Sequence, residues 1–212
     1  FVATTTFDFS EVIDRLCFVN YLADIDEWLV LLRVLGSWRC LFPTGPDESD
    51  DQILSDERTE ARLQAVWPRG TRYETIHRTL YSVHQRVASR YRVGRVFLAG
   101  DSAHLNNPLG GMGMNGGLHD AINLAEKMIA IKRREADAGI LDLYERQRRP
   151  VAIDYINANT ARNRKLMAER EPVERRRAQD DLCRQAENAV TAKAFLMKSS
   201  MIEALRTSER TS

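Results

Sequence analysis

The stretch Arg95-Val-Phe-Leu-Ala-Gly-Asp-Ser-Ala-His104, continuing as Leu105-Asn-Asn-Pro-Leu-Gly-Gly-Met-Gly-Met-Asn115, decides the fold around it. Val96 to Ala99 predicts a short, buried, apolar strand that ends at Gly100-Asp101, and a helix is expected to begin near Asn115. Between them lies a glycine-rich loop. A carboxylate in this place can accept hydrogen bonds from ligand hydroxyls, and glycines allow close approach of the backbone. Because a helix N-terminus offers free N–H groups to negative charge, the stretch predicts a ligand site.

The composition is that of an ordinary globular protein. The chain has 212 residues, of which 43% are hydrophobic and 29% charged, enough for one core or two small lobes. A formal charge of +1 gives no electrostatic case for a nucleic-acid partner. No apolar run approaches the roughly 20 residues that a membrane helix needs, so we expect no membrane partner either.

The cysteines also exclude two kinds of site. The three cysteines are far apart and lack C-x-x-C spacing, so they predict neither a disulfide framework nor a zinc site. This usage favours a reducing, cytoplasmic location. His104 and His119 have no matched partner for a metal or a nucleophile, so we expect no metal site and no catalytic side chain, and we interpret His104 as structural.

The opening stretch and the helix after it resemble the second flavin-contacting motif of the FAD-dependent aromatic hydroxylases, the p-hydroxybenzoate hydroxylase type. The resemblance covers roughly thirty residues with many fixed positions at fixed offsets. It departs from the commonest pattern at Ser102, at Asn106-Asn107 and at Glu126, which leaves the subfamily open. The matching positions are Gly100-Asp101, Ala103-His104, Pro108, Gly110-Gly111, Gly113, Asn115, Asp120-Ala121 and Asn123-Leu124.

The resemblance implies a role for each part of the motif. Asp101 would accept hydrogen bonds from the ribityl hydroxyls of FAD, and Pro108 would lie beside the reactive edge of the isoalloxazine ring. Backbone N–H groups after the glycines would face the pyrimidine side, where a helix N-terminus stabilises negative charge. The FAD-binding residues implied are Asp101, Pro108, Gly110, Gly111, Met112, Gly113, Met114 and Asn115.

The fold class expected is α+β, in three parts. Residues 1–90 would form part of a β-rich substrate-binding domain, an antiparallel sheet built from the aromatic and aliphatic runs at 17–23, 28–33 and 38–42. Residues 91–132 would supply the last strand, the loop and the helix of the FAD-binding lobe. Residues 133–212 would be helical, with a densely charged, solvated segment at 162–184 and an amphipathic segment at 194–206 that packs back on the body.

Single elements follow from local signals. Residues 57–66 predict a helix that ends before Pro68, and residues 43–51 predict a loop. The helix over 117–132 carries one apolar stripe, and residues 140–144 and 151–157 suggest another helix in which Pro150 marks a start or a kink. The stripe comprises Leu118, Ala121, Ile122, Ala125, Met128 and Ile129.

Large aromatic residues and two arginines lie in the first third. Trp28, Trp38 and Phe42 are expected to fill a core rather than to line a substrate pocket. Arg33 and Arg39 could pair with a substrate carboxylate, but solvated or salt-bridged arginine is the simpler interpretation.

The sequence contains no recognisable nucleotide-binding βαβ unit, which in the family that the chain resembles lies at the N-terminus. The one match to G-x-G-x-x-G, Gly111 to Gly116, lies inside the motif loop and too far beyond Ala99 for a Rossmann turn. The resemblance therefore implies the C-terminal half of such an enzyme. The missing N-terminal half would be its partner, and the chain alone would hold FAD weakly or not at all.

By resemblance, the complete enzyme would be an FAD-dependent monooxygenase that uses NAD(P)H and O₂ to hydroxylate an aromatic or similar small substrate, while the fragment alone would be inactive. Two alternatives stay open: another flavoenzyme of the same superfold, such as a reductase or halogenase, or a non-enzymatic helical interaction module built around 130–212. The oligomeric state is left open.

Overall fold

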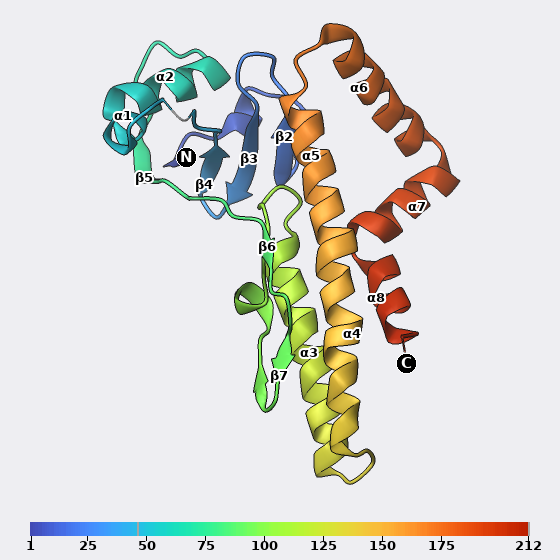
Figure 1. Cartoon of the computed structure of the whole chain (residues 1–212). Helices are drawn as coiled ribbons and strands as arrows, with labels where there is room; N and C mark the ends of the chain where they lie inside the picture. The colour runs from blue at the N-terminus through green and yellow to red at the C-terminus, as the bar shows by residue number, and fades with distance from the viewer. Residues whose placement is uncertain (46, 212) are drawn as a thin grey trace. The chain divides into compact units, whose positions relative to one another are not determined.

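The computed structural model describes residues 1–45 and 47–211, apart from the side chains of 155–157, and it combines helices with strands (Figure 1). The chain forms two compact units, residues 1–82 with 167–170 and residues 83–166 with 171–211. The mixed helix-and-sheet class is confirmed. The expected boundaries at residues 90 and 132 separate parts by their expected function, whereas the two units are separated by their internal contacts. The functional division therefore stays a prediction.

The first unit is built on a five-stranded antiparallel sheet with the strand order β2-β3-β4-β1-β5. The three runs expected to form strands are β2, β3 and β4, with ends that differ by one or two residues. The strands are β1 (Val2–Thr5), β2 (Val19–Leu22), β3 (Leu29–Val34), β4 (Ser37–Leu41) and β5 (Thr75–Thr79).

One face of this sheet carries the core of the unit. Along β4, Trp38 and Cys40 are buried while Arg39 and Leu41 are only half-buried, as the two-residue period of a strand requires. The buried face packs against α1 (Asp50–Leu54) and α2 (Asp56–Val66) in one hydrophobic cluster. The core role of Trp38 and Phe42 is confirmed, whereas Trp28 is half-buried and lies outside the cluster.

The short helices begin at serine caps. Ser49 and Gln52 form a capping box, so α1 begins at Asp50, inside the segment expected to be a loop. The Ser55 side chain accepts a hydrogen bond from the Arg58 N–H and starts α2 close to the expected position. A 3₁₀ turn, η1 (Phe9–Glu11), follows β1.

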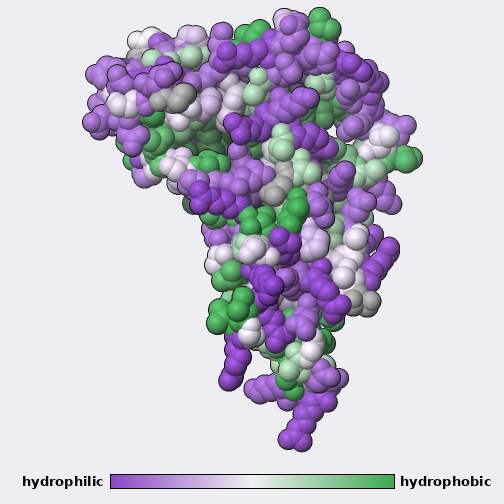
Figure 2. All heavy atoms as spheres, viewed as in Figure 1, coloured by the Kyte–Doolittle hydropathy of each residue, from purple (hydrophilic) through white to green (hydrophobic). Residues whose placement is uncertain are grey.

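The strands of the second unit are two residues long. β6 (Arg86–Val87) pairs with β9 (His104–Leu105), and β7 (Arg92–Val93) pairs with β8 (Val96–Phe97). The expectation of a buried strand over Val96–Ala99 is therefore wrong in length and burial, because β8 pairs only with β7 and Val96 is 65% exposed. Figure 2 shows this hairpin as an apolar patch.

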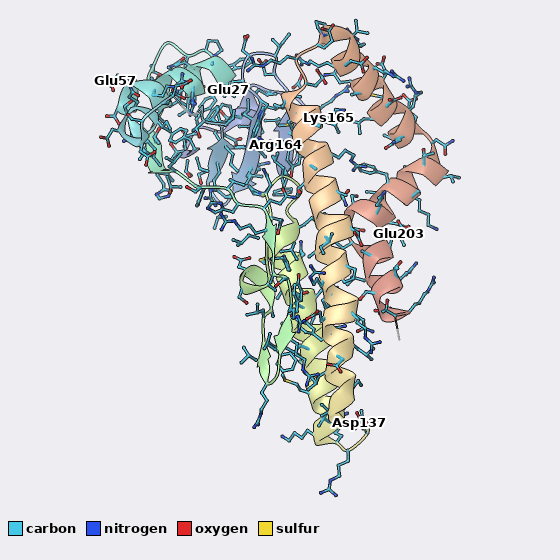
Figure 3. All side chains as sticks on the ribbon, in the orientation of Figure 1. Glu27, Glu57, Asp137, Arg164, Lys165 and Glu203 are labelled. Atoms are coloured by element: carbon cyan, nitrogen blue, oxygen red, sulfur yellow. The ribbon has the colours of Figure 1, made fainter. Side chains whose placement is uncertain are left out.

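Helices make up most of the second unit, and the described turns between them are short (Figure 1). The long helix α3 and the shorter helix α4 lie side by side (Figure 1). The turn between them holds Asp137, labelled in Figure 3, which caps η3 by accepting a hydrogen bond from the Gly139 N–H. The helices are α3 (Met112–Lys132), η3 (Ala138–Leu141), α4 (Asp142–Pro150), the π-helix η4 (Val151–Asn157), α5 (Ala158–Ala168), α6 (Pro172–Glu187), α7 (Ala189–Ser199) and α8 (Ile202–Glu209).

The helical predictions for this region are largely confirmed. The two segments expected around Pro150 are parts of one helical run, and the π-helix begins directly after this proline, which has no N–H to donate. Helix α6 has no buried residue, as expected for a solvated face. The C-terminal helices do pack back, because Met201 is 1% exposed and clusters with Val151.

Membrane-spanning helices, metal-ligand groups and disulfide-paired cysteines are not found among the described residues. Over residues 1–45 and 47–211, no helix combines the length and apolarity that a bilayer crossing needs, and no group of three or more His, Cys, Asp or Glu could hold a metal ion. All three cysteines are free: Cys17 and Cys183 are exposed, and Cys40 is buried.

Candidate functional site

The candidate site begins at the Gly-Asp turn after β8. Residues 100–102 form a 3₁₀ turn, η2, in which Gly100 has a φ of +61°. The Ser102 hydroxyl closes the turn by accepting from the Ala99 N–H at 3.1 Å and donating to the Ala99 carbonyl at 2.8 Å. The Asp101 carboxylate is exposed, and it makes no hydrogen bond or ion pair with any residue that the structure describes. It is therefore an unused acceptor.

A buried carboxylate, Asp120 of α3, holds this turn by a hydrogen bond to its backbone. It is 0% exposed and accepts from the Gly100 N–H at 3.1 Å, from His104 Nε2 at 3.0 Å and from Arg148 Nε at 2.7 Å. Burial is the largest single influence and would raise the pKa of Asp120. The hydrogen bonds from His104, Arg148 and the Gly100 N–H, together with the charge of Arg148, outweigh it and hold this pKa below its ordinary value. The Asp120 cluster (Asp120, His104, Arg148 and Gly100) thus joins the turn to α3, β9 and α4.

The His104 side chain is a buried member of the Asp120 cluster. Its ring is 3% exposed and stacks on Tyr91 with the ring centroids 6.4 Å apart. Because a carboxylate only accepts, Nε2 must carry the proton that faces Asp120. The structural interpretation of His104 agrees with this geometry. Sequence reasoning missed Arg148, since no local signal links α4 to the motif.

Helix α4 also supports the hairpin before the turn. The Glu145 carboxylate accepts from the backbone N–H groups of Tyr91 at 2.7 Å and Arg92 at 3.1 Å. The neighbouring Tyr144 hydroxyl donates to the Leu98 carbonyl at 2.6 Å. Two consecutive side chains of one helix therefore bind main-chain groups on both arms of the hairpin.

The loop after the turn is ordered by its own side chains. The Asn107 side chain accepts from the Leu109 N–H at 3.0 Å, and the Gly111 N–H donates to the Pro108 carbonyl at 3.0 Å. Leu109 is 3% exposed and anchors the loop, while Pro108 is exposed. The loop thus presents its proline to solvent from a fixed backbone.

Helix α3 begins at Met112 rather than near Asn115. Gly111, with a φ of +66°, is the residue before the helix, and the Asn115 side chain donates back to its carbonyl at 3.1 Å. The first N–H groups of a helix have no partner within it, and the first turn of α3 contains no acidic residue to neutralise them. The predicted residues Met112 to Asn115 therefore form the positive end of α3.

The turn and the helix approach each other through two glycines. A β-carbon on Gly117 would lie 3.1 Å from the Gly100 Cα, closer than ordinary van der Waals contact. The structure therefore brings the Gly-Asp turn against the second turn of α3. The eight predicted FAD residues all lie in this one strand–turn–loop–helix segment.

Two pockets open elsewhere on the described residues. One, of about 280 Å³, is lined by Arg90, Arg92, Asp142, Glu145 and Arg146. The other, of about 140 Å³, is lined by Thr6, Asp8, Arg33, Val34, Gly36, Ser37 and Trp38. Neither contains a residue of the predicted FAD set.

The apolar stripe of α3 is exposed. Leu118, Ile122, Met128 and Ile129 have exposed fractions between 45% and 55%, and the alanines between them are exposed too. The buried residues of α3 are instead Gly116, Asp120 and Lys127. The helix therefore turns its polar side inward and its apolar side outward, the reverse of an ordinary surface helix.

Residues 8–159 match the family described as FAD binding domain. The chain belongs to this FAD-binding domain family. Among curated relatives, it is 35% identical over 165 residues to para-nitrophenol 4-monooxygenase of Pseudomonas sp. (strain WBC-3), covering 74% of this chain and 40% of that protein. It is 44% identical over 151 residues to pentachlorophenol 4-monooxygenase of Sphingobium chlorophenolicum, covering 70% of this chain and 28% of that protein.

A solved structure supports the same assignment. The crystal structure of p-nitrophenol 4-monooxygenase from Pseudomonas putida DLL-E4 matches with a TM-score of 0.83 at 29% identity, over 96% of this chain and 52% of that one. The expected resemblance to FAD-dependent aromatic hydroxylases is confirmed. The chain spans less than half of the length of these two curated relatives. The role of each motif residue in binding FAD stays a prediction.

Proposed function

We propose that the complete protein is an FAD-dependent monooxygenase that hydroxylates a phenol or a similar aromatic compound with NAD(P)H and O₂. The observation that carries this proposal is the match of residues 8–159 to the FAD-binding domain family. Relatives named for oxygenation of nitrophenol and chlorophenol favour this reaction over a reductase or halogenase.

The chain's own residues fit the cofactor. The Asp101 carboxylate is exposed with no partner among the described residues, so it can accept from ribityl hydroxyls. Gly110 and Gly111 have φ values of +118° and +66°, which favour glycine, and without side chains they let the loop backbone approach the ring closely. The N–H groups of Met112, Gly113 and Met114 lie in the first turn of α3, where a helix offers them no acceptor, and they suit a negatively charged edge.

FAD, when bound, supplies the redox and oxygen chemistry, and the protein orients it and controls water. In this proposal Asp101 fixes the ribityl chain, and Pro108 limits where the ring can lie. The positive end of α3 stabilises negative charge on the pyrimidine side without any acidic or basic side chain. The Asp120 cluster holds Asp101 in place through the Gly100 N–H.

We infer that the rest of the FAD-binding domain, including a nucleotide-binding βαβ unit, covers the exposed stripe of α3. Four large apolar side chains at roughly half exposure on one helix face are unusual unless a partner buries them. In this proposal that partner also closes the second wall of the cofactor site, so residues 1–212 alone bind FAD weakly.

Asp101→Asn in the complete enzyme tests the cofactor assignment. Loss of the carboxylate charge should weaken FAD binding to the apoenzyme by about tenfold or more, because charge-assisted hydrogen bonds contribute about 1.5–3 kcal/mol. Asp180→Asn, an exposed acid on α6, is the control and should leave the dissociation constant unchanged. An equal FAD affinity in Asp101→Asn and wild type would contradict the assignment of Asp101 to the cofactor. If the wild-type enzyme forms no hydroxylated product from a phenol with NAD(P)H and O₂, the proposed reaction is wrong.

A further inference from the structure

Two side chains beyond residue 159, where the family match ends, contact the candidate cofactor site. Asn163 of α5 lies against the loop after the Gly-Asp turn. Met201, directly before α8, belongs to the cluster against which Met112 packs. Both contacts lie within the second unit, and Figure 1 shows α5 passing beside the loop that precedes α3.

Helix α5 is held beside this loop by a buried polar side chain. Thr160, one turn before Asn163, is 0% exposed, and its hydroxyl accepts from Gln85 Nε2 at 3.2 Å. Gln85 directly precedes β6, and the partner of β6 is β9, after which the loop begins. Because a buried hydroxyl is costly without a hydrogen bond, this contact favours one position of α5 relative to the loop.

Asn163 contacts the loop next to Pro108. Its Nδ2 donates to the Leu109 carbonyl at 3.5 Å, and the same atom lies 3.2 Å from the place that a β-carbon on Gly110 would take. The φ of +118° at Gly110 is one that side-chain-bearing residues rarely adopt. Asn163 therefore meets both residues that follow Pro108, and it limits movement of the loop toward α5.

Met201 supports the first turn of α3. Its side chain is 1% exposed and forms a buried cluster with Val151, against which Met112 and Ala204 pack. The backbone of Met201 has a φ of +65°, in the left-handed region. That conformation is unfavourable for a residue with a side chain, so the packing of Met201 must outweigh the strain. The cluster thus fixes Met112, the residue with which α3 begins.

We propose that Asn163 and Met201 are positioning residues for the flavin ring, so that the cofactor site extends into the C-terminal helices. This inference rests on the proposed FAD-dependent function. Asn163 fixes the loop that carries Pro108, and Met201 fixes the N–H groups at the start of α3. Neither side chain needs to contact FAD, because each acts through the backbone that the cofactor would meet.

Two variants of the complete enzyme test Asn163. Asn163→Ala removes the donor to the Leu109 carbonyl, and Asn163→Asp replaces it with a carboxylate of the same size that repels this carbonyl. Both should weaken FAD binding to the apoenzyme about three- to tenfold. Reduction adds negative charge to the flavin, so Asn163→Asp should also have a lower flavin midpoint potential than Asn163→Ala. Arg164→Ala, an exposed position of α5 labelled in Figure 3, is the control and should match wild type in both measurements.

Three variants test Met201. Met201→Ala and Met201→Gly both remove the side chain, and glycine accepts the left-handed backbone without strain, which keeps the test available if the alanine variant does not fold. Each should weaken FAD binding about three- to tenfold, whereas Met201→Leu, which is close in volume, should bind FAD like wild type. Leu196→Ala is the matched control, because it removes an apolar side chain of α7 that is 61% exposed.

Thermal unfolding of each apoenzyme separates positioning from stability. A lower unfolding temperature with an unchanged FAD dissociation constant and midpoint potential would show a structural role only and would overturn the inference. Equal losses in Arg164→Ala and Leu196→Ala would overturn it too. In either case, normal FAD binding by wild type leaves the proposed function standing, whereas a complete wild-type enzyme that does not bind FAD contradicts the function itself.

Discussion

Replacement of Asp120 by alanine should destabilise the second unit far more than the first. The change removes the acceptor of three hydrogen bonds, from Gly100, His104 and Arg148, and leaves a guanidinium that is 2% exposed without its carboxylate. Removal of one partner of a buried ion pair costs about 3–5 kcal/mol. Asp120→Asn should cost less, because the amide oxygen still accepts from one donor.

Two optical signals separate the units in one urea titration. The three tryptophans, Trp28, Trp38 and Trp67, all lie in residues 1–82, so their fluorescence follows the first unit. Far-UV circular dichroism is dominated by the helices from α3 onward. Asp120→Ala should lower the midpoint of the dichroism transition and leave the fluorescence transition in place.

A double-mutant cycle with Arg148→Met measures the ion pair itself. The double variant should lose less free energy of unfolding than the sum of the single variants, with a coupling of about 1–3 kcal/mol. A dichroism midpoint within error of wild type in Asp120→Ala, or additive single effects, would refute the buried-cluster reasoning.

Because the pKa of Asp120 is lowered in the folded state, its contribution to the free energy of unfolding is complete above the ordinary pKa of 3.8 and disappears as pH falls through the lowered pKa. The stability difference between wild type and Asp120→Asn should therefore shrink below about pH 4.

Two further predictions concern packing. Gly117→Ala should destabilise the second unit by about 1–3 kcal/mol in the same titration, because the new methyl meets the Gly100 backbone at 3.1 Å. Gly70→Ala, where nothing lies within 4 Å, is its control, and equal stabilities of the two variants would count against the close approach. Burial raises the pKa of Cys40 to about 12, so a thiol reagent at pH near 8 should label the two exposed cysteines quickly and Cys40 only after unfolding. Rapid labelling of all three thiols in the folded protein would show that the sheet core is open.

Secondary-structure elements could be predicted where neighbouring residues in the sequence determine them. Pro68 marks the end of α2 in the sequence, and the aromatic and aliphatic run over 38–42 is typical of a strand. The Gly-Asp motif also located the candidate site, because its residues are contiguous. These features need no information about distant parts of the chain.

The support of the site was not predictable. Asp120 meets His104, Gly100 and Arg148 across 16, 20 and 28 sequence positions, and no pattern of spacing reports such contacts. The start of α3 was placed too late because glycines disfavour a helix, whereas Gly111 in the left-handed region allows the helix to begin at Met112. Asp101 was expected at the end of a buried strand, but the strand stops at Phe97 and the carboxylate is exposed.

The contacts of Tyr144 and Glu145 have a mechanical consequence. Strands of two residues contain too few ladder bonds to resist displacement, so the hairpin takes its rigidity from a helix that begins more than forty positions later. The first turn of α4 acts as a clamp on both arms of that hairpin. Any substitution that shifts this turn would carry the Gly-Asp pair with it, and damage to cofactor binding could then originate at a residue that touches no ligand.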